Sequence, residues 1–197
     1  MYRPFKTVEL ENGVVLLVAV PGFGGRIISL IDKRSDREWL AQGNPPAEQA
    51  TECSVFGGDV AAGWDECLPT VAIAVDPVDP CRQLRDHGDV WGRPTEVELD
   101  GDCLALASAV DHWRYQFGRT IRLDDASLRV DYWIENRSTR DLPFLWVMHA
   151  LLDLEPGASL HVRQVERVSL SYSAGSDLIA PAELAWPLAQ TVKASWT

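Results

Sequence analysis

Two short segments concentrate the side chains of this sequence that could carry chemistry. GWDECLPTV, residues 63–71, holds a tryptophan, two adjacent carboxylates and a cysteine. DHGDVWGRP, residues 86–94, holds a histidine, a second tryptophan and an arginine. Glycine and proline punctuate both segments, which is typical of loops, and loops on a rigid scaffold commonly carry binding and catalytic residues. We therefore expect the two segments to line one site.

The two segments combine flat aromatic faces with charged and polar groups. Trp64 and Trp91 could stack on the C–H surfaces of sugar rings. The side chains beside them that could bond the hydroxyl groups are Asp65, Glu66, His87 and Arg93. The two carboxylates could instead only brace their loop. The mixture predicts a site for a neutral polyol, and a protein interface, which also favours Trp and Arg, is the alternative.

His149 is the histidine outside these segments with the best setting for acid–base chemistry. It follows the apolar run FLWVM and precedes ALLDLEPG, so we expect it at a strand end among buried neighbours. A histidine held in such a place is suited to proton transfer. The spacing alone also fits a structural role for His87 and His149, and it predicts surface or structural roles for His112 and His161.

Composition excludes several classes of partner. The sequence has 197 residues, 46% of them apolar and 24% charged, which is ordinary for a globular protein with a real core. The net charge is −11, and so acidic a surface repels phosphate backbones and anionic lipids, so neither nucleic acid nor membrane is expected as a partner. There is no long apolar run, and the start MYRPFKTVELENG lacks an apolar signal core, so a cytoplasmic location is expected.

Familiar catalytic and metal-binding motifs are missing from the sequence. It contains no GxSxG elbow, no GK[ST] phosphate loop and no HExxH pair. The four cysteines are Cys53, Cys67, Cys81 and Cys103. They form no CxxC pair, and no histidine lies at zinc-finger spacing from them. We therefore expect unpaired thiols in a reducing compartment, no metal and no cofactor. A role of the cysteines in metal binding or redox chemistry is the less favoured alternative.

The elements that must hold these groups have the periodicity of strands. In SLRVDYWIEN, residues 127–136, apolar and polar side chains alternate. RYQFGRTIRL, residues 114–123, has the same pattern, and the DDAS turn between the two predicts a hairpin. A second hairpin is predicted for ENGVVLLVAV and GGRIISLID, which are joined by the PGFGG turn at residues 21–25.

Four further segments complete a series of short strands, and these are TEVEL, LALASAV, FLWVM and SLHVRQVERVSL. Evidence for helices is poor. Many short strands at regular spacing predict an all-β fold, an antiparallel β-sandwich. No internal repeat and no long linker divides the chain, so a single domain over residues 1–197 is expected.

Five segments, in this order, are similar to the bacterial branch of the aldose 1-epimerase (galactose mutarotase-like) family that carries a GWDE segment. They are GGRIISLIDKRSDREWL, GWDECLPTV, DHGDVWGRP, LRVDYWIEN and LPFLWVMHALLDLEPG. The similarity covers nearly the whole chain. It implies a large antiparallel β-sandwich, often called a supersandwich, in agreement with the strand pattern.

The resemblance implies chemistry at the anomeric carbon of an aldohexose, whose pyranose ring opens and recloses. An acid protonates the ring oxygen, and a base removes the proton of the C1 hydroxyl. His149 matches the family's acid. His87 matches the histidine that binds and polarises the sugar, and Arg26 in GGRI is similar to an arginine that contacts the sugar.

The sequence also departs from the family. Ala150 stands where the family often has proline, and Asp89 stands at the second glycine of its His-Gly-Gly loop. The family's base is a glutamate near the C-terminus, whereas the last residues here, LAWPLAQTVKASWT, resemble the middle of a family domain, so the matching glutamate is expected to be missing. Either Glu66 or Asp65 stands in as the catalytic base, or the chain is a truncated or shortened relative.

Three hypotheses follow from these observations. The first is an epimerase acting on an aldohexose, with His149, His87 and Glu66 as its catalytic residues. The second is a non-catalytic carbohydrate-binding or regulatory protein, and the third is a structural or interaction domain. Missing strands would leave sheet edges open, so a homodimer through such an edge is a further possibility. The negative charge mildly favours a neutral over a phosphorylated sugar.

Overall fold

The computed structural model describes an all-β protein, in which every regular element among the described residues is a strand. The described residues are 5–43, 50, 54–57, 61–159, 161–170, 182–186, 189–190 and 195–196. Within them, no helix has the length and apolar character needed to cross a membrane. The chain divides into two compact units, residues 1–154 and 155–197. The expectation of one domain over residues 1–197 stays a prediction.

The first unit contains two antiparallel sheets and one short strand pair. The strands of the first sheet are β1 (Val8–Glu11), β2 (Val15–Val20), β3 (Arg26–Asp32), β5 (Trp64–Cys67) and β12 (Val147–Ala150) in spatial order, with β4 (Arg37–Glu38) also paired to β3. The strands of the second sheet are β11 (Ser127–Asn136), β10 (Tyr115–Asp124), β9 (Cys103–Val110) and β8 (Glu96–Asp100) in spatial order. The separate pair is β6 (Ala74–Val75) with β7 (Gln83–Leu84).

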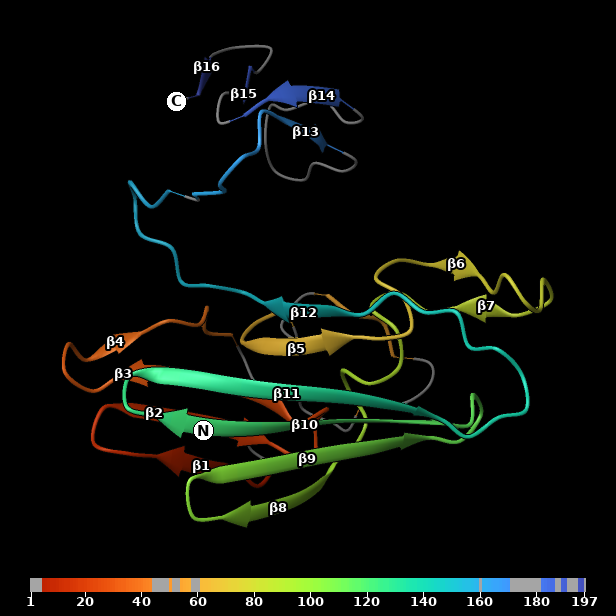
Figure 1. The fold of residues 1–197 in the computed structure, drawn as a ribbon, viewed down its shortest axis with the longest axis horizontal. Coiled ribbons are helices and arrows are strands. Elements are labelled where there is room, and N and C mark those ends of the chain that lie inside the picture. The colour runs from red at the N-terminus through yellow and green to blue at the C-terminus, as the bar shows by residue number, and fades with distance from the viewer. Residues whose placement is uncertain are drawn as a thin grey trace. The chain divides into compact units, whose positions relative to one another are not determined.

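The two sheets pack face to face, as a β-sandwich requires (Figure 1). One hydrophobic cluster joins Leu17 and Ile27 of the first sheet to Leu104 and Ile121 of the second, and all four side chains are fully buried. In β9 and β10 buried positions alternate with more exposed ones, because successive side chains of a strand point to opposite faces. The predicted all-β sandwich is therefore confirmed.

Both predicted hairpins are present. β10 and β11 pair from Tyr115 with Asn136 to Asp124 with Ser127, and the turn residue Asp125 has the left-handed φ of 50° that a tight hairpin needs. The apolar face predicted for 127–136 packs on the core. β2 and β3 form the other hairpin, with a register shift after Val18.

Where the structure describes the second unit, two short strand pairs are present. β13 (Arg167–Leu170) pairs with β14 (Ala182–Ala185), and β15 (Ala189–Gln190) pairs with β16 (Ser195–Trp196). Of the described residues in SLHVRQVERVSL, where a strand was expected, only the last four are in one, and residue 160 lies outside the described residues. Gln164 adopts a left-handed φ of 59°, which a strand cannot contain, so the chain turns there first.

Candidate functional site

The β5–β12 pair brings the first predicted site segment beside His149. The two strands are antiparallel, and their register places His149 opposite Asp65 and Val147 opposite Cys67. Since side chains alternate along a strand, Asp65 and Cys67 share one face of β5, and Trp64 shares the other with Glu66. The segment WDEC, expected in a loop, is thus a buried strand that presents different chemistry on each face.

Asp65 connects His149 to Arg26. Nδ1 of His149 lies 2.7 Å from Oδ1 of Asp65, and NH2 of Arg26 donates to Oδ2 at 2.6 Å. The Arg26 and Asp65 side chains are almost completely buried, whereas the His149 side chain is 28% exposed. Because the carboxylate of this ion pair accepts hydrogen bonds, it holds the proton on Nδ1 of His149 and leaves Nε2 for other chemistry.

Glu66 is the centre of a buried hydrogen-bond network on the opposite face of β5. Four side chains donate to its carboxylate, and these are Trp64, Arg119, Tyr132 and Trp146. Burial raises the pKa of Glu66, and the Arg119 guanidinium and the other donors oppose that shift. The four donors to Glu66 come from both sheets, so this network connects the two sheets and stabilises the sandwich.

The second predicted segment lies at the end of β5 because two close backbone contacts anchor it there. The Asp89 N–H donates to the Leu68 carbonyl at 2.7 Å, and Gly88 forms a parallel bridge with Leu68. Gly88 has a φ of 71°, and a Cβ atom on it would overlap the Leu68 backbone. Gly88 therefore positions the preceding residue, His87, whose φ is 58°, beside Cys67. A larger residue at position 88 would be strained.

His87 and His149 face each other with an aromatic ring beside them. Their ring centroids are 5.1 Å apart. Phe56 stacks on His87 with a centroid distance of 3.8 Å and lies edge-on to His149 at 5.5 Å. Nδ1 of His87 lies 3.1 Å from Oδ2 of Asp86, close enough for an ion pair but without the alignment of a hydrogen bond. The two predicted histidines thus occupy one site.

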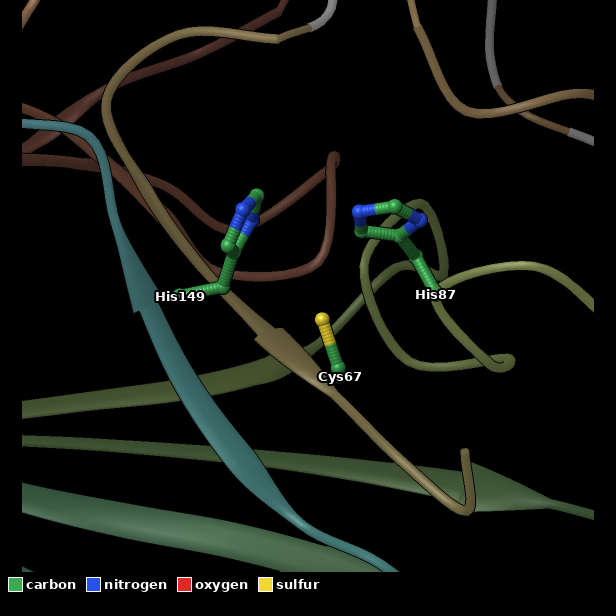
Figure 2. Close-up of side chains that lie close together, drawn as sticks. All are labelled: Cys67, His87 and His149. Carbon is green, nitrogen blue, oxygen red and sulfur yellow. The ribbon is translucent and has the colours of Figure 1, made fainter. Parts of the chain in front are cut away.

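Cys67 lies beneath this histidine pair, as Figure 2 shows. One ligand atom from each of Cys67, His87 and His149 lies within 4.8 Å of the others. Burial raises the pKa of the Cys67 thiol to about 12, and the nearby Asp65 and Glu66 carboxylates add to the shift. At neutral pH the cysteine is therefore a buried, neutral thiol.

The predicted stacking tryptophans are buried. Trp64 is 6% exposed within the main core, and Trp91 is 2% exposed in a separate cluster with Phe23. In this packing protein atoms cover both faces, and the stacking roles stay predictions. Arg93 is turned toward His112, with a distance of 3.1 Å from its NH2 to Nδ1. Of the predicted binding residues, Arg26 and Asp65 belong to the histidine site.

Sequence reasoning missed two members of the site, Phe56 and Cys67. Phe56 stands alone in the segment SVFGG, where no periodic pattern marks it. Cys67 carries no sequence signal for a metal site, because metal and redox motifs have short spacings, whereas its neighbours His87 and His149 are 20 and 82 residues away. The signal that could have found it is its place two residues after Asp65, on the same face of a strand.

Comparisons with known proteins add little. No protein-family model matches the sequence, and no curated protein is detectably similar to it. Structures similar to this chain include a 4-alpha-glucanotransferase from Thermococcus litoralis, with 16% identity and a TM-score of 0.42 over 68% of this chain and 23% of that one. A TPR-domain containing protein from Parabacteroides distasonis has 21% identity and a TM-score of 0.42 over 65% of this chain and 21% of that one. The chain thus spans less than a quarter of either protein.

Proposed function

We propose that this protein binds an aldohexose at the His87–His149 site and interconverts its anomers by acid–base ring opening, as an aldose 1-epimerase does. The observation that carries the proposal is the pair of histidine rings 5.1 Å apart, one of which is held by the buried Asp65–Arg26 ion pair. Two positioned imidazoles at this separation can serve two oxygens of one sugar ring. The reaction needs one proton donor and one proton acceptor at such oxygens.

His149 is the proposed acid. The Asp65 carboxylate accepts a hydrogen bond from Nδ1 and orients the ring, so Nε2 can deliver a proton to the ring oxygen. Arg26 holds Asp65 in place rather than contacting the sugar, since it is fully buried behind the carboxylate.

His87 is the proposed base. Both carboxylates considered as a replacement for the family's glutamate are committed to internal partners, Asp65 to Arg26 and Glu66 to four donors. Among the described residues, the imidazole of His87 lies beside His149, with Asp86 3.1 Å from its Nδ1. Phe56 supplies an apolar ring face beside both histidines, the part first assigned to a tryptophan.

A non-catalytic carbohydrate-binding protein is the second candidate. The involvement of Glu66 in a buried network favours it, because the carboxylate best placed in the sequence to replace the family's base is then committed to internal donors. Such a chain would bind the sugar beside Phe56 and the histidines and leave anomer exchange at its spontaneous rate.

Polarimetry or one-dimensional NMR of freshly dissolved α-glucose and α-galactose separates the two candidates. The epimerase proposal expects faster anomer equilibration with the protein than without it. His149→Ala and His87→Ala should each lower the acceleration by roughly 10²- to 10⁴-fold. His112→Ala is the matched control, because that histidine belongs to the group around Arg93 and Asp89.

Each outcome has a clear meaning. Acceleration that survives in both histidine variants contradicts the assignment of the site. No acceleration together with sugar-dependent quenching of tryptophan fluorescence supports the binding protein. Neither acceleration nor quenching contradicts both candidates and favours an interaction domain.

A homodimer and a cytoplasmic location remain further parts of the proposal. Among the described strands β11 pairs on one side only, with β10, and its ten residues offer a long edge. Sedimentation of a single species at the mass of one chain, 21.9 kDa, would contradict the dimer.

A further inference from the structure

We propose that Cys67, His87 and His149 form a binding site for one zinc-type divalent cation, with three protein ligands and an open fourth position. The proposal does not rest on the sugar chemistry above. It also departs from the expectation of no metal, because the three residues come from β5, from the loop after β7 and from β12.

Distance supports the site. The three ligand atoms lie within 4.8 Å of one another. In a tetrahedral zinc site, with Zn–S near 2.3 Å and Zn–N near 2.0 Å, two ligand atoms are about 3.3–3.7 Å apart. Closing a separation of 4.8 Å to this range would require the ligand atoms to approach by up to about 1.5 Å.

The backbones that carry the ligands are fixed. Cys67 and His149 lie on neighbouring strands in a defined register, and Gly88 fastens the His87 loop to the end of β5. Figure 2 shows the three side chains converging from these separate segments. A preformed arrangement of this kind lowers the entropy that binding must overcome.

Each histidine has a carboxylate at one nitrogen, an arrangement that is common around protein-bound zinc. Asp65 lies 2.7 Å from Nδ1 of His149, and Asp86 lies 3.1 Å from Nδ1 of His87. The Asp65 carboxylate accepts the hydrogen bond of Nδ1 of His149, which sets the tautomer of that ring and makes its Nε2 a better ligand, whereas Asp86 contributes only its charge beside Nδ1 of His87 and leaves Nε2 of that ring as the donor. The two Nε2 atoms are then the donors, and the Cys67 thiolate is the third.

Charge also suits a cation. One thiolate and two neutral imidazoles leave a divalent ion with a net charge of +1, and the Asp86 carboxylate lies beside His87 to offset it. The metal would displace the proton of the buried Cys67 thiol, so binding should release one proton per ion.

The same three residues could be interpreted as a nucleophilic Cys–His–Asp arrangement. Cys67 is fully buried, whereas a nucleophilic cysteine is partly exposed to its substrate. A metal ligand needs no access for a substrate at the sulfur atom, so the burial fits the cation site better.

A bound ion would use the Nε2 atoms that the proposed sugar chemistry needs. Zinc should therefore inhibit anomer exchange by the metal-free chain. The two proposals can still fail separately, because ion binding is measured here without any sugar.

The test is titration of the metal-free protein with Co²⁺, followed by displacement with Zn²⁺. A variant with serine at Cys53, Cys81 and Cys103 keeps Cys67 as its single thiol. We expect one ion per chain, a thiolate-to-cobalt charge-transfer band in the near ultraviolet, and release of one proton. Cys67→Ser should abolish the band, and His87→Ala should weaken Zn²⁺ binding by at least about 100-fold, since loss of an outer partner alone costs 10- to 100-fold.

Asp65→Asn should weaken Zn²⁺ binding by about 10- to 100-fold with the band retained. His112→Ala should leave the affinity unchanged. Circular dichroism checks that each variant is folded, and His87→Ala keeps the test decisive if Cys67→Ser does not fold, since His87 lies in a loop. Absence of binding at micromolar Co²⁺, a spectrum without the charge-transfer band, or an affinity unaffected by His87→Ala would each overturn the proposal.

Discussion

Asp65 and His149 face each other across the β5–β12 strand pair, with 2.7 Å between Oδ1 of the carboxylate and Nδ1 of the ring. They are 84 residues apart in the sequence, and Arg26 holds the other oxygen of the carboxylate from β3. Three strands of one sheet therefore contribute to the orientation of one imidazole. Both the proposed proton transfer and the proposed cation site depend on this contact.

Asp65→Asn should destabilise the fold. The change leaves the Arg26 guanidinium buried without its counter-charge, and breaking a buried ion pair in this way costs about 3–5 kcal/mol. Urea denaturation followed by circular dichroism measures the loss. Asp131→Asn is the matched control, because its partners Arg122 and Arg129 are exposed, and it should leave the midpoint unchanged. Equal midpoints for the two variants would contradict the importance of the Arg26 pair.

Glu66→Ala should be among the most damaging substitutions of the first unit. It removes the acceptor of four buried donors, including a guanidinium, which predicts a loss of at least about 3–5 kcal/mol. Glu66→Gln keeps the volume and one acceptor oxygen, so it should be less damaging. A folded Glu66→Gln chain that loses anomer exchange completely would instead indicate that Glu66 is the catalytic base.

Gly88→Ala should displace the His87 loop from β5. Alanine at a φ of 71° costs about 1–2 kcal/mol before any overlap, and the Leu68 backbone leaves no room for a Cβ atom. Thermal unfolding should show the loss, and the chemical shifts of the His87 ring should change. Gly13→Ala is the control, because a Cβ atom there meets nothing. A Gly88→Ala chain with unchanged His87 signals would contradict the anchoring contact.

Phe56→Ala should weaken sugar binding. The ring stacks on His87 and lies beside His149, so its removal takes away the apolar face of the site. An aromatic contact of about 0.5–1.5 kcal/mol corresponds to a loss of affinity of roughly 2- to 10-fold, measurable by tryptophan quenching. Phe144→Ala, at an exposed position, is the control. An unchanged affinity in Phe56→Ala would place the sugar elsewhere.

Cys67 should resist thiol reagents in the metal-free native protein. Burial raises the pKa of its thiol to about 12, so the reactive thiolate is scarce at pH 8 and is also shielded. Chains with Cys67 or Cys81 as the single cysteine provide the comparison, because Cys81 is exposed. Ellman's reagent should label Cys81 quickly and Cys67 only after unfolding. Fast labelling of native Cys67 would contradict its burial.

Much of the fold could be predicted from the sequence because strand periodicity is a local property. The alternation in 114–123 and 127–136, with a turn between them, was sufficient to predict the β10–β11 hairpin. The same logic failed for 159–166, where a turn at Gln164 interrupts the pattern. Hydrophobic alternation shows which residues face a core, but it does not show which strands become neighbours.

The sequence by itself determined the all-β class, two hairpins and the two segments that carry His87 and Asp65. Only the tertiary structure decided what these groups do to one another. The order of the strands places His149 opposite Asp65. On one face of β5, Glu66 points into the core, and on the other face Cys67 lies beside the two histidines. The physical reason is that periodicity is encoded by neighbours in the chain, whereas register and strand order follow from packing between residues 20 to 84 positions apart.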